Sequence, residues 1–368
     1  MLIKSLHVKN FRNHENTRVE LSPQTNIFVG QNAQGKTNLL EAIYLTCVGR
    51  GWRTNKDRDM IKFGTDNASV KAVVEKKYGT IGVEIGLFNQ SKKSIKINEI
   101  PIQKMGELMG QINAVFFSPD ELRLIKDAPA DRRRFMDIDI SQMNKTYFYS
   151  LLRYNKILAQ RNALLKSTTE PVATGLEIWD EQLAKVAANI IDARLDFLSL
   201  LKLHVTKVHN FLTSGTEQIE LNYATVTDTT EDILTIDKKA DDIERLLLQK
   251  LKAAREKDMR QKTTTVGPHR DDIIIKIDGR DVRYFASQGQ QRTVALSIKL
   301  AELEIFKNQT GEMPILLLDD VFSELDATRQ AKLLEAIAKI QSIITTTSTE
   351  NLPSAKVFKI SNGKVDER

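Results

Sequence analysis

A glycine-rich loop between an apolar strand and a helix constrains the fold of this chain more than any other feature. Residues 30–37 read Gly-Gln-Asn-Ala-Gln-Gly-Lys-Thr and match the pattern G-x-x-x-x-G-K-[ST] at every fixed position. The short apolar run 26–29 precedes the loop, and apolar residues at helical spacing follow it over 38–48. Strand, loop and helix in this order predict a phosphate-binding loop in an α/β domain.

Each fixed position of the loop has a chemical reason. Glycines let backbone N–H groups curl around phosphate oxygens, and the following helix presents its positive end. Lys36 is expected to reach the β- and γ-phosphates, and the Thr37 hydroxyl to hold Mg²⁺. The loop alone does not distinguish kinases, GTPases, helicases and ABC-type proteins, and its alternative is a chance glycine-rich turn. The predicted phosphate-binding residues are Gly30, Gln31, Asn32, Ala33, Gln34, Gly35, Lys36 and Thr37.

A second apolar segment, 314–318, ends in the two carboxylates Asp319 and Asp320. A fully apolar run is typical of a parallel strand covered on both faces, and ligands gather at the carboxyl ends of such strands. We expect Asp319 to support Mg²⁺ and Asp320 to orient or deprotonate an attacking water, so that both act with Lys36 as catalytic residues. The alternative role of the acidic pair is to cap the next helix.

Two short polar segments precede predicted helices and each has two interpretations. A serine such as Ser287 can cap the helix that follows or offer its hydroxyl to an anion, and Gly289 permits close approach of the backbone to a ligand. Read alone, both segments are helix caps. The first segment is Ser287, Gln288, Gly289 and Gln290, and the second is Ser323, Glu324, Leu325 and Asp326.

The chain has 368 residues, which exceeds one average domain and favours two lobes or one domain with a large insertion. Strand patterns dominate 1–117 and 264–368, whereas long helical patterns dominate 118–263. We therefore predict a discontinuous α/β domain with a mostly helical lobe, 118–263, inserted in it. No run approaches the roughly 18 apolar residues of a membrane span, and the single Cys47 excludes a disulfide framework. A cytoplasmic protein without a membrane segment is expected.

A net charge of +6 suggests a polyanionic partner, although residues of both signs are abundant. Each basic cluster has a solvated surface as its alternative, and the arginine triplet can instead pair with acids or nucleotide. No zinc-finger, homeodomain or RNA-recognition motif is present, so we expect binding to the backbone of duplex DNA or a duplex–single-strand junction. The candidate clusters are Arg50, Arg53, Lys56 and Arg58; Arg132, Arg133 and Arg134; and Lys252, Arg255, Lys257, Arg260 and Lys262.

Taken in order, these motifs resemble the head domain of the SMC/ABC-type DNA-repair ATPases and, within that group, the RecF family of recombination mediators. The resemblance runs nearly end to end. Its most specific parts are the segment Lys-Asn-Phe-Arg-Asn at 9–13 and the box Gly-Pro-His-Arg-Asp-Asp at 267–272, for which the residues alone indicate only a constrained turn. Further segments that carry it are 30–37, 40–44, 49–54, 117–122, 287–292, 319–320 and 323–326.

The resemblance implies an ABC/SMC-type ATPase head, with a mixed sheet and flanking helices, of which two copies close face to face on two ATP molecules with Mg²⁺. Ser287 and its neighbours would contact the γ-phosphate held by Lys36 of the other copy, and residues 323–326 would be the D-loop at the interface. Arg12 and Asn13 would help to bind the nucleotide in their own copy.

The implied activity is a weak, DNA-stimulated ATPase that closes on duplex or gapped DNA. With RecO and RecR it would assist the loading of the recombinase RecA. An alternative from another class is a structural DNA-binding scaffold with a degenerate nucleotide pocket. The presence of Lys36, Thr37, Asp319 and Asp320 together argues against that alternative, and the inserted lobe argues against a transporter subunit.

The chain departs from the pattern of ABC proteins at three points. Gln288 replaces a small residue of the signature loop. No histidine follows the last strand of the core, where residues 345–349 read Thr-Thr-Thr-Ser-Thr, so a hydroxyl is expected to sense the γ-phosphate. No glutamine loop is evident, and the segment 117–120 is assigned to that connection.

Overall fold

The computed structural model describes residues 1–54, 56–167, 173–225, 240–348 and 355–367, and the chain forms two compact units. The first unit comprises Met1–Leu122 and Ala295–Arg368, and the second comprises Arg123–Val294. The second unit therefore extends about 30 residues beyond the boundary at 263 expected from the sequence pattern. The reason is that strand β10 (Asp272–Ile277) pairs with β9 (Ile219–Ala224) and not with a strand of the first unit.

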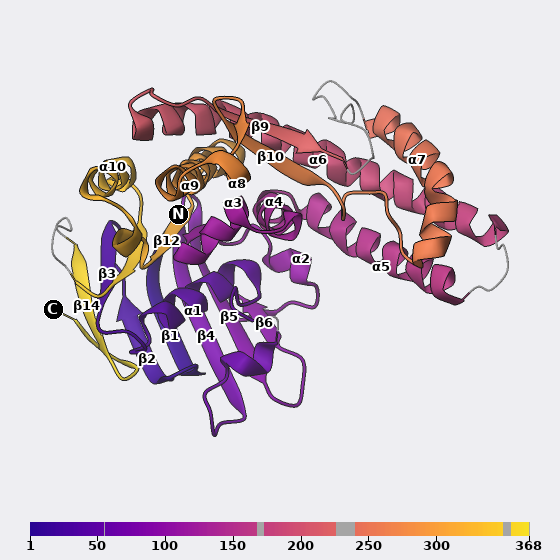
Figure 1. Cartoon of the computed structure of the whole chain (residues 1–368). Coiled ribbons are helices and arrows are strands. Elements are labelled where there is room, and N and C mark those ends of the chain that lie inside the picture. Colours follow the sequence, from indigo (N-terminus) through magenta and orange to yellow (C-terminus); the bar gives the residue numbers. More distant parts are fainter. Residues whose placement is uncertain (55, 168–172, 226–239, 349–354, 368) are drawn as a thin grey trace. The chain divides into compact units, whose positions relative to one another are not determined.

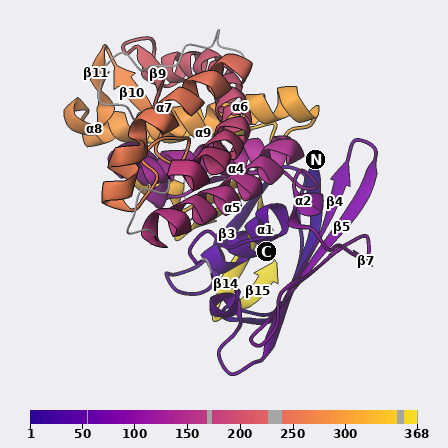
Figure 2. The same ribbon diagram turned by 90° about the vertical axis from the view of Figure 1, so that its right-hand side faces the viewer.

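An antiparallel sheet of the first unit is built from the N-terminal third of the chain, and Figure 2 shows its paired strands β4 and β5. Its strand order is β2-β1-β4-β5-β6-β7. Buried and exposed residues alternate along β4, as a sheet with one covered face requires. The strands are β1 (Leu2–Phe11), β2 (His14–Glu20), β4 (Asn67–Lys76), β5 (Gly79–Phe88), β6 (Ser94–Ile97) and β7 (Ile100–Pro101).

The second sheet of this unit is mostly parallel and has the order β15-β14-β3-β13-β12-β8. The acidic strand β12 lies between β13 and β8 and is parallel to both, which confirms the parallel strand predicted from its apolar run. Strand β13 separates β12 from β3, the strand before the phosphate loop. The strands are β3 (Thr25–Val29), β8 (Ala114–Phe117), β12 (Ile315–Asp319), β13 (Ser342–Thr346), β14 (Lys356–Ser361) and β15 (Lys364–Glu367).

Helix α1 (Lys36–Val48) packs between the two sheets of the first unit (Figure 1). It contacts β1, β4 and β5 on one side and β8, β12 and β13 on the other. Because α1 is covered on both sides, almost every residue from Leu39 to Val48 is buried. Four short helices, η1 (Asp57–Met60), α2 (Met105–Leu108), η2 (Pro119–Leu122) and η3 (Val321–Glu324), and helix α10 (Ala327–Ile337) complete the unit.

The second unit is mostly helical, as the sequence predicts, with a three-stranded sheet of order β11-β10-β9. Helix α6 (Ala173–Thr213) packs against α5 (Lys145–Ser167) and α7 (Ala240–Gln261) (Figure 1). No helix in the described ranges is both long enough and apolar enough to cross a membrane. The remaining elements are α3 (Arg123–Lys126), α4 (Pro129–Met143), β11 (Arg280–Asp281), α8 (Val282–Phe285) and α9 (Gln288–Thr310), which continues into the first unit.

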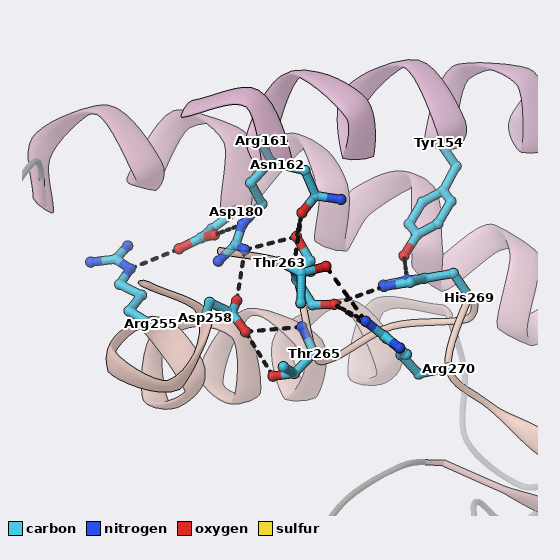
Figure 3. A network of polar contacts seen from close by, with 11 residues as sticks. Tyr154, Arg161, Asn162, Asp180, Arg255, Asp258, Thr263, Thr265, His269 and Arg270 are labelled. Atoms are coloured by element: carbon cyan, nitrogen blue, oxygen red, sulfur yellow. Dashed lines mark hydrogen bonds and ion pairs between the residues drawn. The ribbon is translucent and has the colours of Figure 1, made fainter. Parts of the chain in front are cut away.

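Buried charges join the three long helices of the second unit (Figure 3). The side chain of Arg161 on α5 is fully buried, and its Nε and Nη1 atoms donate to Asp180 of α6 at 2.8 Å and Asp258 of α7 at 2.7 Å. Arg255 donates to the other oxygen of Asp180 at 2.8 Å. A buried charge is tolerated only when it is paired. This network therefore fixes the register of the helices.

The box at residues 267–272 anchors the same unit. His269 Nδ1 lies 2.6 Å from the Tyr154 hydroxyl, and its Nε2 lies 3.1 Å from the carbonyl oxygen of Thr264 (Figure 3). A neutral ring that carries its proton on Nε2 satisfies both contacts. Burial, followed by nearby arginines, lowers the pKa of His269 to about 4. The box, for which the sequence alone indicated only a turn, thus has a packing role.

The two aspartates of the box account for part of the predicted arginine cluster. Arg132 is buried and donates from two nitrogens to both carboxylate oxygens of Asp272, at 2.6 and 3.0 Å. Arg133 donates to the backbone carbonyl of Asp271 at 2.7 Å. Arg132 therefore pairs with an acid inside the protein, which is the alternative that the sequence left open for the arginine triplet, and it is not a DNA contact.

Candidate functional site

The shape of the phosphate loop depends on two of its glycines. A Cβ atom at Gly30 would lie 2.3 Å from the backbone oxygen of Ile360, because β14 passes close to the loop. Gly35 has a φ of 114°, in the region that favours glycine, and Ala33 also has a positive φ of 64°. These conformations turn the loop back on itself before α1 begins at Lys36.

The Lys36 ammonium lies within the loop. It donates to the backbone oxygens of Gly30 at 2.6 Å and Gln31 at 2.9 Å, and its residue is buried. Burial lowers the pKa of Lys36 below its ordinary value, although the carboxylates of Asp320 and Asp319 act in the opposite direction. A cation whose hydrogen bonds go to neutral carbonyls is well placed to bind phosphate oxygens, which carry charge and accept stronger hydrogen bonds.

Three side chains meet at the carboxyl end of β12. The hydroxyls of Thr37 and Thr345 both donate to Asp319 Oδ1, each at 2.7 Å. The backbone N–H of Asp320 donates to the Thr345 hydroxyl at 3.0 Å. Strand order explains the meeting, because β13 carries Thr345 between β12 and the strand that leads to Thr37.

Oxygen atoms of Thr37 and Asp319 fit Mg²⁺, which prefers hard oxygen ligands and usually keeps water and substrate phosphates in its shell. Within the described part of the chain, no group of three or more His, Cys, Asp or Glu side chains could hold a metal ion. A hydroxyl and one carboxylate are too few to hold the ion alone, so its binding here would require the phosphates of a nucleotide.

Asp320 and the four residues of the predicted D-loop, 323–326, follow the carboxyl end of β12. Asp320 has the left-handed φ of 51°, and its backbone oxygen accepts from the Ser323 hydroxyl at 2.7 Å. Asp326 caps α10 by accepting from the backbone N–H of Arg329 at 2.9 Å, as the sequence predicts. Leu325 is buried, whereas the side chain of Glu324 lies outside the part of the chain that the structure describes.

Asn13 and Arg12 lie on the side of the loop that faces the antiparallel sheet. Asn13 donates to the carbonyl of Gln34 at 3.0 Å and accepts from Asn38 at 2.7 Å. Arg12 donates to both carboxylate oxygens of Glu41, at 2.8 and 3.1 Å. Asn13 thus stabilises the phosphate loop through a direct hydrogen bond, and Arg12 binds helix α1, which follows the loop.

Glu41 also binds Arg53, which the sequence analysis assigned to DNA. Arg53 Nη2 donates to Glu41 and to Asn38, both at 2.5 Å. Burial raises the pKa of Glu41, but the hydrogen bonds and charges of Arg12 and Arg53 outweigh burial, and its pKa lies below the ordinary value. Arg53 and Arg12 thus share the Glu41 carboxylate, and the Arg53 guanidinium is held beside the loop helix.

His14, Asn38 and Glu41 are site neighbours that sequence reasoning did not assign. His14 Nε2 lies 3.0 Å from the carbonyl oxygen of Gly35, and its Nδ1 lies 2.8 Å from that of Gly363. Burial lowers the pKa of this histidine. A signal was available for Glu41, because a carboxylate within the apolar stretch 39–48 needs a partner.

A cavity of about 730 Å³ opens beside the phosphate loop. It lies where β3, β13 and β14 end, which is the edge at which parallel sheets bind ligands. Thr347, one of the hydroxyl residues expected to replace the missing histidine, lines it, whereas Thr349 lies outside the described residues. The lining residues are Val29, Gly30, Gln31, Gln34, Thr347, Val357, Lys359, Ile360, Ser361 and Asn362.

The signature-like segment begins α9 in the second unit and forms a capping box. Gln290 N donates to the Ser287 hydroxyl at 3.2 Å, and Ser287 N donates to the Gln290 side chain at 2.9 Å. Ser287 and Gln288 are exposed. The cap interpretation is therefore correct, and it is compatible with anion binding because the capping serine oxygen only accepts, which leaves its O–H proton as a donor.

The other basic residues predicted to contact DNA differ in how much of the side chain is exposed to solvent. Arg50, Lys56 and Arg58 are exposed in the first unit, and Lys252 is exposed on α7. Arg255 is mostly buried and paired with Asp180 and Glu177, so its charge is used within the helical unit. Lys257, Arg260 and Lys262 are also exposed.

Comparison with known proteins places this geometry in a family. Residues 2–364 match the family model described as RecF/RecN/SMC N terminal domain, so the chain has the fold of an ABC/SMC-type ATPase head with its inserted helices. It is 44% identical over 371 residues to the DNA replication and repair protein RecF of Clostridium botulinum (strain ATCC 19397 / Type A), and the match covers 99% of each protein.

Solved structures agree with this match. A structure of the recombination mediator protein RecF-ATPrS in the RecFOR pathway superimposes with a TM-score of 0.91 and 39% identity, covering 99% of this chain and 97% of that one. A structure of RecF-ATP in the same pathway gives a TM-score of 0.89 and 38% identity, covering 100% and 99%. The chain belongs to the RecF family of SMC/ABC-type ATPases.

Proposed function

We propose that this protein is an ATP-dependent DNA-binding protein of replication and recombinational repair. ATP joins two copies into a dimer that closes on duplex or gapped DNA, and slow hydrolysis reopens it. The observation that carries the proposal is the intact site around Asp319, where Thr37 and Thr345 converge beside Lys36. Relatives named DNA replication and repair protein RecF, and a solved RecF-ATP structure, support it.

In the nucleotide-bound state, Lys36 exchanges the carbonyls of Gly30 and Gln31 for the β- and γ-phosphates. Backbone N–H groups of the loop bind the remaining phosphate oxygens. Thr37 and Asp319 would hold Mg²⁺, which supplies neutralisation of the charge that develops on the transferred phosphoryl group. Asp320 orients the attacking water and accepts its proton. Thr345 holds the backbone N–H of Asp320 and the carboxylate of Asp319 and so positions both acids.

The dimer follows from the position of Ser287. Its hydroxyl oxygen accepts within the capping box, and its proton is donated to the γ-phosphate at the Lys36 site of the other copy. ATP can favour the closed dimer only through contacts that the open state lacks, and this contact is one of them. Residues 323–326 would lie at the same interface.

Contacts with DNA are proposed for basic side chains on the ground of their exposure. Arg50, Lys56, Arg58 and Lys252 are exposed, whereas Arg53 and Arg255 are paired with the buried carboxylates of Glu41 and Asp180. Such contacts address the phosphate backbone and carry little sequence information. RecO and RecR are the proposed protein partners in loading RecA, and the cytoplasm is the proposed location.

The test is phosphate release with and without duplex DNA. We expect slow Mg²⁺-dependent hydrolysis that duplex DNA accelerates, and its loss in Lys36→Ala, in which the cation that binds the phosphates is missing. A protein that binds DNA but neither binds nor hydrolyses ATP would contradict the proposal and favour the scaffold. The presence of Lys36, Thr37, Asp319 and Asp320 together in the described site argues against the scaffold.

A further inference from the structure

Two aromatic side chains stand exposed immediately before the signature-like segment. Tyr284 is 75% exposed and Phe285 is 70% exposed, and both belong to the four-residue helix α8. Single exposed aromatic residues are common on protein surfaces, but adjacent ones that form a contiguous exposed patch can mark a binding site. The reaction proposed above assigns no role to either residue.

The exposure is built into the structure, because ion pairs hold α8 in place. Asp281 caps the helix by accepting from the Arg283 backbone at 2.9 Å, and it binds the Arg283 guanidinium at 2.7 Å. Arg283 also lies 3.5 Å from Asp272, the partner of buried Arg132. The ion pairs of Arg283 with Asp281 and Asp272 thus hold helix α8, and with it the position of Tyr284.

The two rings and Arg283 form a stacking surface. The guanidinium carbon of Arg283 lies 5.3 Å from the centre of the Tyr284 ring, a cation–π contact that covers part of that ring. The Phe285 ring is 6.5 Å away and inclined at 74° to it. The Tyr284 ring contacts the Arg283 cation and is otherwise mostly exposed, and the Phe285 ring is steeply inclined to it. This arrangement suits a flat aromatic ligand that stacks on the exposed ring.

Charge near the rings disfavours a nucleic-acid strand as that ligand. Surfaces that stack the bases of a strand combine aromatic residues with a positive groove along the phosphates. Here Arg283 is neutralised by Asp281, and Glu217 accepts from Gln290 at the start of α9. The surface therefore fits the base of a nucleotide whose phosphates bind at another site better than it fits the bases of a nucleic-acid strand.

We infer that Tyr284 and Phe285 receive the adenine base of the ATP molecule bound at the phosphate loop of a second copy. This rests on the proposed dimer, in which Ser287 meets the terminal phosphate of that same ATP. The Cα atoms of Tyr284 and Ser287 are three residue steps of about 3.8 Å apart along the chain and therefore lie no more than about 11 Å from each other. One nucleotide can thus contact the hydroxyl with its terminal phosphate and the rings with its base.

Dimer affinity gives the first test. The double variant Tyr284→Ala/Phe285→Ala removes both rings and no ion pair, and Tyr149→Ala, which removes another exposed aromatic of the second unit, is the matched control. At saturating Mg-ATP we expect the dimer dissociation constant to rise about tenfold or more in the double variant, because stacking is lost on both bases of the dimer. ATP affinity of the monomer and the thermal midpoint should match wild type.

Photolabelling with 8-azido-ATP then locates the base. The peptide that contains Tyr284 and Phe285 should be labelled in the wild-type dimer and lose its label in Ser287→Arg, which cannot close on the nucleotide. An unweakened dimer in the double variant, or label confined to other peptides, would overturn the inference. Loss of DNA binding alone would reassign the rings to DNA. Failure of wild type to dimerise with ATP would instead remove the proposed function and the inference with it.

Discussion

The Thr37 hydroxyl donates a 2.7 Å hydrogen bond to the carboxylate of Asp319, a residue 282 positions further along the chain. The two come together because β3 and β12 lie on either side of β13 in one parallel sheet, whose strands end at the same edge. Thr345, at the end of β13, donates to the same carboxylate oxygen. The fold itself therefore brings together the hydroxyl and the acid that would hold a metal ion.

Asp320→Asn should separate ATP binding from hydrolysis. The amide is close in shape to the carboxylate but cannot accept the proton of the attacking water. General-base catalysis contributes roughly 10²- to 10⁴-fold, so single-turnover phosphate release should slow by at least about 100-fold. ATP affinity and ATP-induced dimerisation, measured on the same samples, should persist. Hydrolysis at the wild-type rate would show that another group activates the water.

Much of this site follows from the sequence because its motifs are local. The loop at 30–37 and the acids after 318 each carry their own strand, and parallel topology brings them to one edge. The pairing of Arg53 with Glu41 could not be predicted, because it depends on how the segment after α1 folds back on that helix. For the same reason Arg53 was assigned to DNA when only its charge was considered.

DNA binding should depend steeply on salt. If about six phosphates are neutralised, log K falls with log salt at a slope near −5. Each of Arg58→Ala and Lys252→Ala should reduce that slope by about one and weaken binding to all sequences alike. Arg255→Ala tests the specificity of the effect: it should leave the slope unchanged, because Asp180 neutralises that guanidinium. A salt-independent affinity would contradict backbone recognition.

Arg161→Met should destabilise the second unit. The substitution leaves Asp180 and Asp258 buried without their shared cation, and breaking a buried pair in this way costs about 3–5 kcal/mol. Urea unfolding, followed by circular dichroism, should show the loss. Exposed Arg153→Met on the same helix should change the free energy of unfolding by less than about 0.5 kcal/mol. Equal effects of the two substitutions would show that the network contributes nothing specific.

Acid should weaken the fold through His269. Its pKa is about 4 in the folded chain, below the ordinary 6.5, so the unfolded chain binds a proton first as pH falls. The contribution of His269 is complete above pH 6.5 and is lost between pH 6.5 and 4, by roughly 3 kcal/mol. His269→Gln, whose amide can still bind Tyr154 and Thr264, should flatten the pH dependence of unfolding in that window. An unchanged pH profile would argue against the neutral buried ring.

In the helical unit, the sequence predicts the helices but not the contacts between them. Its helices are evident from their periodicity, but the partners of Arg161 lie on two other helices and depend on packing. The contact-based boundary lies beyond 263 for a related reason: the pattern at 273–277 predicts a strand without indicating which sheet that strand joins. The role of His269 likewise appears only when Tyr154 and Thr264 are brought beside it.

The molar mass of the protein in solution, measured by light scattering with and without Mg-ATP, tests the shared site most directly. Wild type should be a monomer without nucleotide and twice that mass with ATP. Ser287→Arg should bind ATP with wild-type affinity and stay monomeric, because the arginine obstructs the approach of α9 to the second copy's phosphate. A Ser287→Arg protein that dimerises with ATP as wild type does would contradict the account.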